Sequence, residues 1–211
     1  LERSIETFQG LDSNMDGRYA INIAGVYNYI AETYRLEGDY DQAFSNYDQA
    51  IAYNRNRGCY PGAALFYTNY GVAAYQSGNI QEAKRLFRYA ISIYEESHEY
   101  SEYPIALSYT ALFDSQEGNL DQAAERISSA LKLCDTIGSP WWKGVAIYIT
   151  WKIRNLMKEK RWSCPRLEAL WPDSETEHCT WGLSYLRRLQ PRIETRELEQ
   201  ALQRAAEEET P

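Results

Sequence analysis

One short phrase recurs at a fixed distance along this chain and constrains its fold more than any other feature. It consists of a glycine, then an aspartate or asparagine, then an alanine five positions after the glycine, and it occurs at Gly38–Ala43, Gly78–Ala83 and Gly118–Ala123. The three glycines are forty residues apart. A period of roughly 20 to 50 residues is typical of solenoids, which stack one small structural unit many times. The phrase therefore predicts an array of repeated units.

Each of these glycines separates two amphipathic patterns, in which apolar residues recur at spacings of three, four and seven. Such patterns predict helices, at residues 18–37 and 40–55, 65–77 and 80–96, and 105–117 and 120–136. Residues 56–62 and 98–104 are expected to be connectors. A further first helix is expected at 141–160, where Lys158 stands in place of the next glycine. No segment alternates with a period of two, so the predicted fold is all-α.

The composition indicates which classes of partner are not expected and in which compartment the protein is expected to lie. A net charge of −8 argues against general binding to phosphate backbones, so direct nucleic-acid binding is not expected. The four cysteines have no paired spacing, which predicts reduced thiols and a cytoplasmic protein. No apolar run is long enough for a membrane span, so no membrane association is expected.

The period also predicts the domain organisation. Residues 1–17 are expected to be the end of a preceding repeat with its connector, residues 18–160 the repeat array, and residues 161–211 atypical C-terminal capping helices with a frayed acidic tail. Because the chain lacks an initiator methionine, we expect it to be part of a larger multidomain protein. An uncovered N-terminal repeat would expose a core face, which leaves self-association open.

The residues of these pairs resemble the tetratricopeptide repeat, whose first helix carries a small residue and whose second carries two alanines around an aromatic. The matching sets are Ala31, Gly38, Ala43, Tyr47 and Ala50; then Gly71, Gly78, Ala83, Phe87 and Ala90; then Ala111, Gly118, Ala123, Ile127 and Ala130. The match covers residues 20–136, and its forty-residue period exceeds the usual spacing of about thirty-four. Longer repeats of this type occur in signalling regulators and adaptors. The resemblance implies a right-handed superhelical solenoid of antiparallel helix pairs, and a binding module instead of an enzyme.

The resemblance also implies a concave groove lined by the first helices, and the register assigns residues to it. These are Asn28, Glu32 and Arg35; Thr68, Asn69, Val72, Tyr75 and Gln76; Ser108, Leu112, Ser115 and Gln116; and Tyr148, Lys152 and Asn155. Amide side chains among them can donate to and accept from a peptide backbone. The alternative is that these side chains merely solvate an exposed face. Recognition of acidic chaperone C-termini is not expected, since Glu32 would repel a carboxylate.

A second surface is predicted where the period ends. Arg154, Lys158 and Arg161 share one helical face and form a secondary basic patch, which would suit an acidic partner or nucleic acid if it is not simply a solvated face. The neighbouring pair Trp141-Trp142 would be a strong interface anchor if exposed.

Catalysis, cofactors and metals are not expected. The two histidines, His98 and His178, have no acid or nucleophile at a meaningful spacing, and a zinc site from Cys164, His178 and Cys179 would lack a fourth ligand. The predicted function is a protein- or peptide-binding scaffold. The alternative is a ligand- or peptide-sensing regulatory domain that controls an attached effector, such as a DNA-binding or NTPase module.

Overall fold

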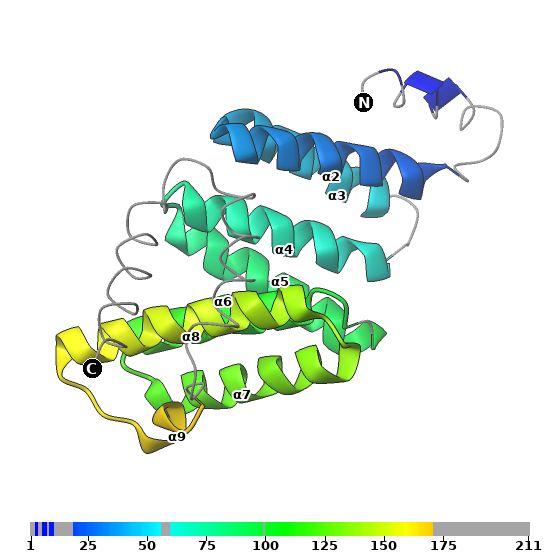
Figure 1. Ribbon diagram of the computed structural model, residues 1–211. Helices are drawn as coiled ribbons and strands as arrows, with labels where there is room; N and C mark the ends of the chain where they lie inside the picture. Colours follow the sequence, from blue (N-terminus) through cyan, green and yellow to red (C-terminus); the bar gives the residue numbers. More distant parts are fainter. Residues whose placement is uncertain are drawn as a thin grey trace, which may run out of the picture. The chain divides into compact units, whose positions relative to one another are not determined.

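The computed structural model describes residues 3, 6, 7, 9, 10, 19–55, 60–98 and 100–170, and every regular element among them is helical. The helices are α2 (Ala20–Glu37), α3 (Tyr40–Arg55), α4 (Tyr60–Gln76), α5 (Ile80–Ser97), α6 (Tyr103–Gln116), α7 (Leu120–Ile137), α8 (Pro140–Lys160) and α9 (Pro165–Glu168) (Figure 1). The predicted all-α fold is therefore confirmed. Most of the expected C-terminal capping region and its acidic tail, residues 171–211, lies outside the described residues.

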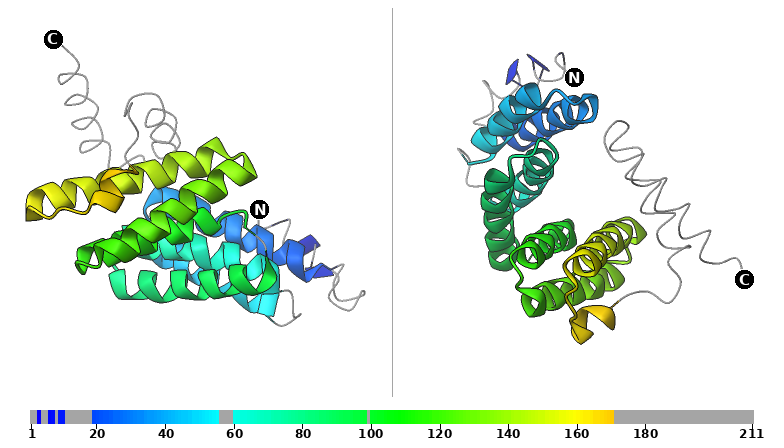
Figure 2. Two further views of the ribbon diagram at one scale, coloured as in Figure 1. Left: turned by 90° about the horizontal axis from the view of Figure 1, so that it is seen from below. Right: turned by 90° about the vertical axis from the view of Figure 1, so that its left-hand side faces the viewer.

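The chain divides into two compact units, Leu1–Glu99 and Tyr100–Pro211, and each is built from antiparallel helix pairs. In the first unit, α2 packs against α3 and α4 against α5, while α3 also packs against α4 and so joins the two pairs. Both views of Figure 2 show the members of each pair running side by side. In the second unit, α6 packs against α7, α8 packs against both of them, and α9 packs against α7.

The repeated glycines end the first helix of each pair. Gly38, Gly78 and Gly118 have φ angles of 81°, 84° and 84°, a left-handed conformation that glycine adopts without steric cost. The Gly38 amide donates to the Arg35 carbonyl, and the next amide donates to the Tyr34 carbonyl, which together close the helix. The second helix then begins two residues after each glycine. The forty-residue phrase is thus the tight turn within each helix pair.

The small and large residues of the repeated motif form the core of each pair. All of the following are buried: Ala31, Gly71 and Ala111 in the first helices, and Ala43, Ala83, Ala123, Tyr47, Phe87, Ile127, Ala50, Ala90 and Ala130 in the second. At Gly71 a Cβ atom would lie 3.0 Å from the Phe87 ring. In the second pair the Phe87 ring therefore packs directly against a position that has no side chain.

The two predicted connectors are shorter than expected. Helix α4 begins at Tyr60 instead of residue 65, and α6 begins at Tyr103 instead of residue 105. Pro61 and Pro104 each stand at the second position of their helix. Proline fits the first helical turn because that turn does not use its backbone N–H groups, so these prolines start helices where they were predicted to lie in connectors.

The missing fourth glycine has a structural consequence. Lys158 remains within α8, which ends at Lys160, and the capping residue Arg161 adopts a left-handed φ of 56°. The Trp162 amide then donates to the Met157 carbonyl over 2.9 Å, as in a glycine-terminated helix. A residue with a Cβ atom thus occupies the conformation that glycine adopts in the turn within each earlier helix pair.

Candidate binding surface of the first helices

The predicted groove residues of the first unit come from α2 and α4, and two of their contacts join these helices. The amide of Asn69 donates to Oδ1 of Asn28 over 3.2 Å, and Nη1 of Arg35 donates to Oε1 of Gln76 over 2.9 Å. In both bonds the partners are 41 residues apart, and the two bonds are seven residues, or about two helical turns, apart along each helix. Side chains that were predicted to contact a ligand therefore also form hydrogen bonds between one repeat and the next.

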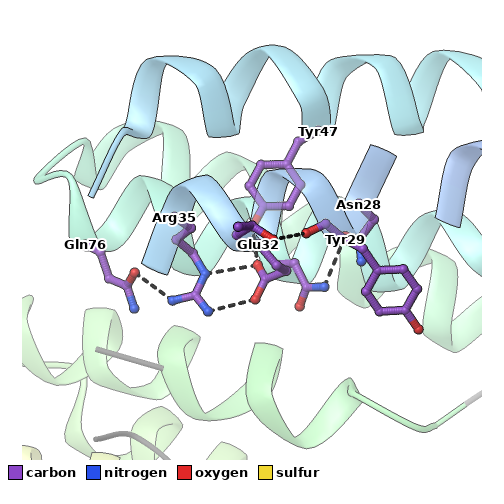
Figure 3. A network of polar contacts seen from close by, with 8 residues as sticks. Asn28, Tyr29, Glu32, Arg35, Tyr47 and Gln76 are labelled. Atoms are coloured by element: carbon purple, nitrogen blue, oxygen red, sulfur yellow. Dashed lines mark hydrogen bonds and ion pairs between the residues drawn. The ribbon is translucent and has the colours of Figure 1, made fainter. Parts of the chain in front are cut away.

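Arg35 is the centre of a larger network in the same unit (Figure 3). Its Nε and Nη2 atoms donate to the two carboxylate oxygens of Glu32, over 3.0 and 2.7 Å. The hydroxyl of Tyr47, from α3, donates to the same carboxylate. Arg35 is only 4% exposed and Tyr47 is fully buried, while Glu32 is half-buried, so a buried guanidinium and a buried phenol both bond to one carboxylate that reaches the surface.

The network carries no net charge, and burial raises the pKa of its one phenol. Burial first, and then the negative charge of Glu32, raise the pKa of Tyr47 well above its ordinary value. The charge of Glu32 is balanced by the bidentate contact with Arg35. This surface therefore offers no net charge to a ligand, which does not favour recognition of a free carboxylate.

The predicted groove residues fall into two groups by burial. The buried ones are Asn28, Arg35, Thr68, Ser108, Leu112, Ser115 and Tyr148, and the half-buried or exposed ones are Glu32, Asn69, Val72, Tyr75, Gln76, Gln116, Lys152 and Asn155. Four of the buried residues occupy one repeat position, forty residues apart from 28 to 148. That position lies inside the packing in every repeat, and its residues cannot meet a partner without movement of the helices.

The buried hydroxyls at this position are bonded within their own helices. Thr68 donates to the Ala64 carbonyl over 2.8 Å and lies 3.2 Å from the hydroxyl of Tyr94. Ser108 donates to the Pro104 carbonyl over 2.7 Å. These contacts satisfy the polar atoms internally, so the two side chains have a structural role in the fold.

In the second unit, the candidate residues of α8 contact one another. The Nζ atom of Lys152 lies 5.1 Å from the centre of the Tyr148 ring, and that ring stacks on Trp151 with 6.0 Å between centroids. Lys152 is half-buried, so its ammonium group is held against an aromatic face. This arrangement positions a cation at the surface of α8.

The secondary basic patch lies at the C-terminal end of α8. Lys158 and Arg161 are exposed, whereas Arg154 is half-buried and engaged in contacts of its own. Cations in the last turn interact favourably with the negative end of the helix dipole. This provides a structural reason for the cluster that requires no partner.

Two exposed apolar residues on α2 were not selected from the sequence. Ile21 is 55% exposed and Tyr29 is 66% exposed, and Figure 3 shows the Tyr29 ring pointing away from the Arg35 network. The sequence does contain an indication of this apolar face, because no charged residue occurs between Tyr19 and Ala31. Helical periodicity alone did not reveal that these two apolar side chains are exposed.

The described residues contain no candidate membrane span and no candidate metal site. None of the described helices is long and apolar enough to cross a membrane. Within the same residues, no cluster of three or more histidine, cysteine, aspartate or glutamate side chains could hold a metal ion.

Part of the chain matches a known family. Residues 22–96, which extend from α2 to the end of α5, match the model of the tetratricopeptide repeat. Repeats of this family generally mediate protein–protein interaction. No curated protein matches the chain.

Proposed function

Because residues 22–96 match the tetratricopeptide repeat family, we propose that this chain binds a protein or peptide segment along the first helices of its repeats. The observation that supports this proposal is the arrangement of two half-buried amides on α4, Asn69 and Gln76. Each is held by one bond to α2. Asn69 uses a donor in that bond and keeps its acceptor, whereas Gln76 uses its acceptor and keeps its donors.

The spacing of these amides suits a peptide backbone. Seven residues along α4 correspond to about 10 Å, which is the length of about three residues of an extended peptide. A peptide backbone offers both donors and acceptors along that length. Val72 and Tyr75, both half-buried on the same helix, would contact the apolar side chains of the bound segment. The neutral Arg35 network favours an internal segment over an acidic C-terminus.

The proposal is tested by selecting binders and mapping them. Peptides selected from a random displayed library against the whole chain would be titrated by calorimetry against the wild type, Asn69→Ala and Tyr75→Ala. We expect each substitution to weaken binding by about tenfold, which corresponds to one lost hydrogen bond or aromatic contact.

A matched control lies on α7, where Ser129 is exposed and distant in sequence from α2 and α4. Ser129→Ala should leave the affinity unchanged, and circular dichroism should show native helix content in all variants. If both α4 variants bind as well as the wild type does, the binding surface lies elsewhere, and the basic patch and Trp141, which is 38% exposed, become the next candidates.

The bond between Arg35 and Gln76 supports regulation as a second candidate function. It joins two repeats and lies beside the proposed peptide contacts. A ligand that competes for Gln76 would therefore alter the packing of α4 on α2. Hydrogen exchange of the α2 and α4 amides, measured with and without a selected peptide, would detect such a change. Unaltered exchange at saturation would favour a rigid scaffold.

A further inference from the structure

The exposed apolar residues of α2 belong to one continuous row. Ile21, Gly25, Tyr29 and Thr33 are spaced by four residues, which places them along a single ridge of the helix surface. Ile21 and Tyr29 are 55% and 66% exposed, Thr33 is exposed and Gly25 is half-buried. A ridge of this kind is the element through which helices pack in globular proteins.

Nothing within 4 Å of Gly25 among the described residues requires a glycine at this position. A Cβ atom built on it would meet nothing within 4 Å, whereas one built on Gly71 would lie 3.0 Å from Phe87. Glycine in a helix interior lowers stability relative to alanine, so its presence calls for a benefit elsewhere. Close approach by a helix from outside the chain would provide that benefit.

Two positions of the corresponding row are buried in α6 and α8. Eighty residues after Tyr29 and Thr33 stand Tyr109 and Phe113 of α6, which are 4% and 3% exposed. At the equivalent positions of α8, Ile149 and Ile153 are fully buried. In α4 the corresponding residues Leu65 and Asn69 are half-buried. The positions of Tyr29 and Thr33 are thus buried in α6 and α8, whereas on α2 the side chains of Ile21 and Tyr29 are exposed.

The charge and the symmetry of the row indicate what covers it. The chain carries a net charge of −8, yet no charged residue occurs from Tyr19 to Ala31, so a second copy can approach here without repulsion between close charges. Ile21 and Tyr29 lie four residues on either side of Gly25. A two-fold axis passing near Gly25 would place Ile21 of each protomer against Tyr29 of the other, so the same contact would form two times.

We propose that the Ile21–Gly25–Tyr29 row of α2 is a homodimer interface, in which two antiparallel α2 helices cross at Gly25. The glycine admits the partner helix, and the isoleucine and tyrosine supply the apolar contacts. One helix of eighteen residues is about 27 Å long. A single helix pair buries less than the area of about 1,200 Å² that a standard stable interface requires, so the dimer is weak and depends on concentration.

Sedimentation equilibrium of the whole chain between roughly 1 µM and 1 mM tests the proposal, because a modest interface dissociates in this range. We expect the wild type to shift from monomer to dimer, and Tyr29→Glu to weaken dimerisation by about thirtyfold or more, the loss typical of an aromatic anchor. Tyr89→Glu is the matched control, since Tyr89 is 50% exposed on α5. It should dimerise like the wild type.

Cross-linking provides a second readout that does not depend on adding charge. In a Cys59→Ser, Cys179→Ser background, Gly25→Cys should form a disulfide-linked dimer on mild oxidation, since the axis brings the two introduced thiols together. Gln49→Cys, at an exposed position of α3, should not. The proposal is overturned if the wild type is monomeric throughout, if Tyr29→Glu dimerises normally, or if position 25 cross-links no better than position 49.

Discussion

Arg35 on α2 donates to Gln76 on α4 over 2.9 Å while its other nitrogens hold Glu32, so one guanidinium serves both its own helix and the next repeat. The chain contains a second Glu–Arg pair with the same spacing, Glu82 and Arg85 on α5. The Arg85 side chain is 52% exposed, and the Arg35 side chain is 2% exposed. These two pairs therefore separate the effect of burial from that of sequence spacing.

The first prediction concerns these two arginines. Arg35→Ala should lower the free energy of unfolding by about 3 kcal/mol, because it leaves Glu32 and Gln76 unpaired beside a buried phenol. Arg85→Ala should cost less than about 1 kcal/mol, since water replaces an exposed ion pair readily. Urea denaturation of both variants would measure the difference. Equal losses would mean that the Arg35 network contributes nothing beyond a surface pair.

The second prediction contrasts two helical glycines. Gly25→Ala should stabilise the monomer by about 0.5–1 kcal/mol, because alanine is the better helix former and its Cβ meets nothing within 4 Å. Gly71→Ala should destabilise by about 1–2 kcal/mol, because its Cβ would lie 3.0 Å from the Phe87 ring. Thermal unfolding at low protein concentration would measure both changes free of association.

The third repeat supplies the control for this contrast, since it has Ala111 and Ile127 at the positions of Gly71 and Phe87. Phe87→Ile should therefore cost less in the Gly71→Ala background than it does alone, because the added methyl group fills part of the space that the ring vacates. Additive losses in the double variant would show that these two positions do not compete for the same space.

The repeat residues explain why the fold was predictable from the sequence. Each repeat motif has two local roles. The glycines at 38, 78 and 118 form a left-handed turn, and the alanines at 43, 83 and 123 allow a close helix contact. Because both recur with a fixed period, both can be recognised in the sequence. The start of α4 at Tyr60 was missed because Pro61 is compatible with both a connector and a first helical turn.

The candidate surface was less predictable, because burial depends on the neighbouring repeat. The register placed Asn28 and Thr68 in the groove, and both are buried, since the adjoining helices cover that position. No periodicity indicates that Asn69 reaches Asn28, 41 residues away, or that Tyr29 is open where Tyr109 is covered. Whether a side chain is covered, and which residue it contacts, depends on which helix packs against it. That is a property of the packed repeats.

The third prediction tests the turn glycines. Gly78→Val should cost about 1–3 kcal/mol, because a β-branched residue is strained at a φ of 84° even though its Cβ would meet nothing within 4 Å. Gly78→Asn should cost clearly less, since asparagine tolerates this conformation better than valine does. Thermal unfolding of the two variants would compare them, and identical losses would show that φ strain does not determine the effect.

The fourth prediction applies the same reasoning in reverse at the end of α8. Arg161 has a left-handed φ of 56° and is exposed, so Arg161→Gly should stabilise the chain by up to about 1 kcal/mol. Lys158→Gly, which restores glycine at the position that the period specifies, should instead destabilise, because Lys158 lies within α8. Thermal unfolding of the two variants should move in opposite directions. Stabilisation by Lys158→Gly would mean that the helix ends at the position given by the period.

The last prediction follows from the raised pKa of Tyr47. A phenol whose pKa is higher in the folded state favours folding fully below its unfolded pKa of about 10, and this contribution is lost as the pH rises above that value. Stability should therefore decline above pH 10 by up to about 1.4 kcal/mol per pH unit for this group. Tyr47→Phe removes the titrating group and should flatten the decline while lowering stability at pH 7, where the bond to Glu32 is lost.

Tyr70 provides the internal comparison, because burial raises its pKa to about 12 and its ring stacks on Tyr47 with 5.1 Å between centroids. Tyr70 titrates in both proteins, so the Tyr47→Phe curve should retain a shallower alkaline slope instead of becoming level. Urea unfolding at pH 7, 9, 10 and 11 would resolve the two slopes. Parallel curves for the wild type and Tyr47→Phe would show that the phenol of Tyr47 is no harder to ionise in the fold than in the unfolded chain, and the buried Arg35 network would then need another explanation for its stability.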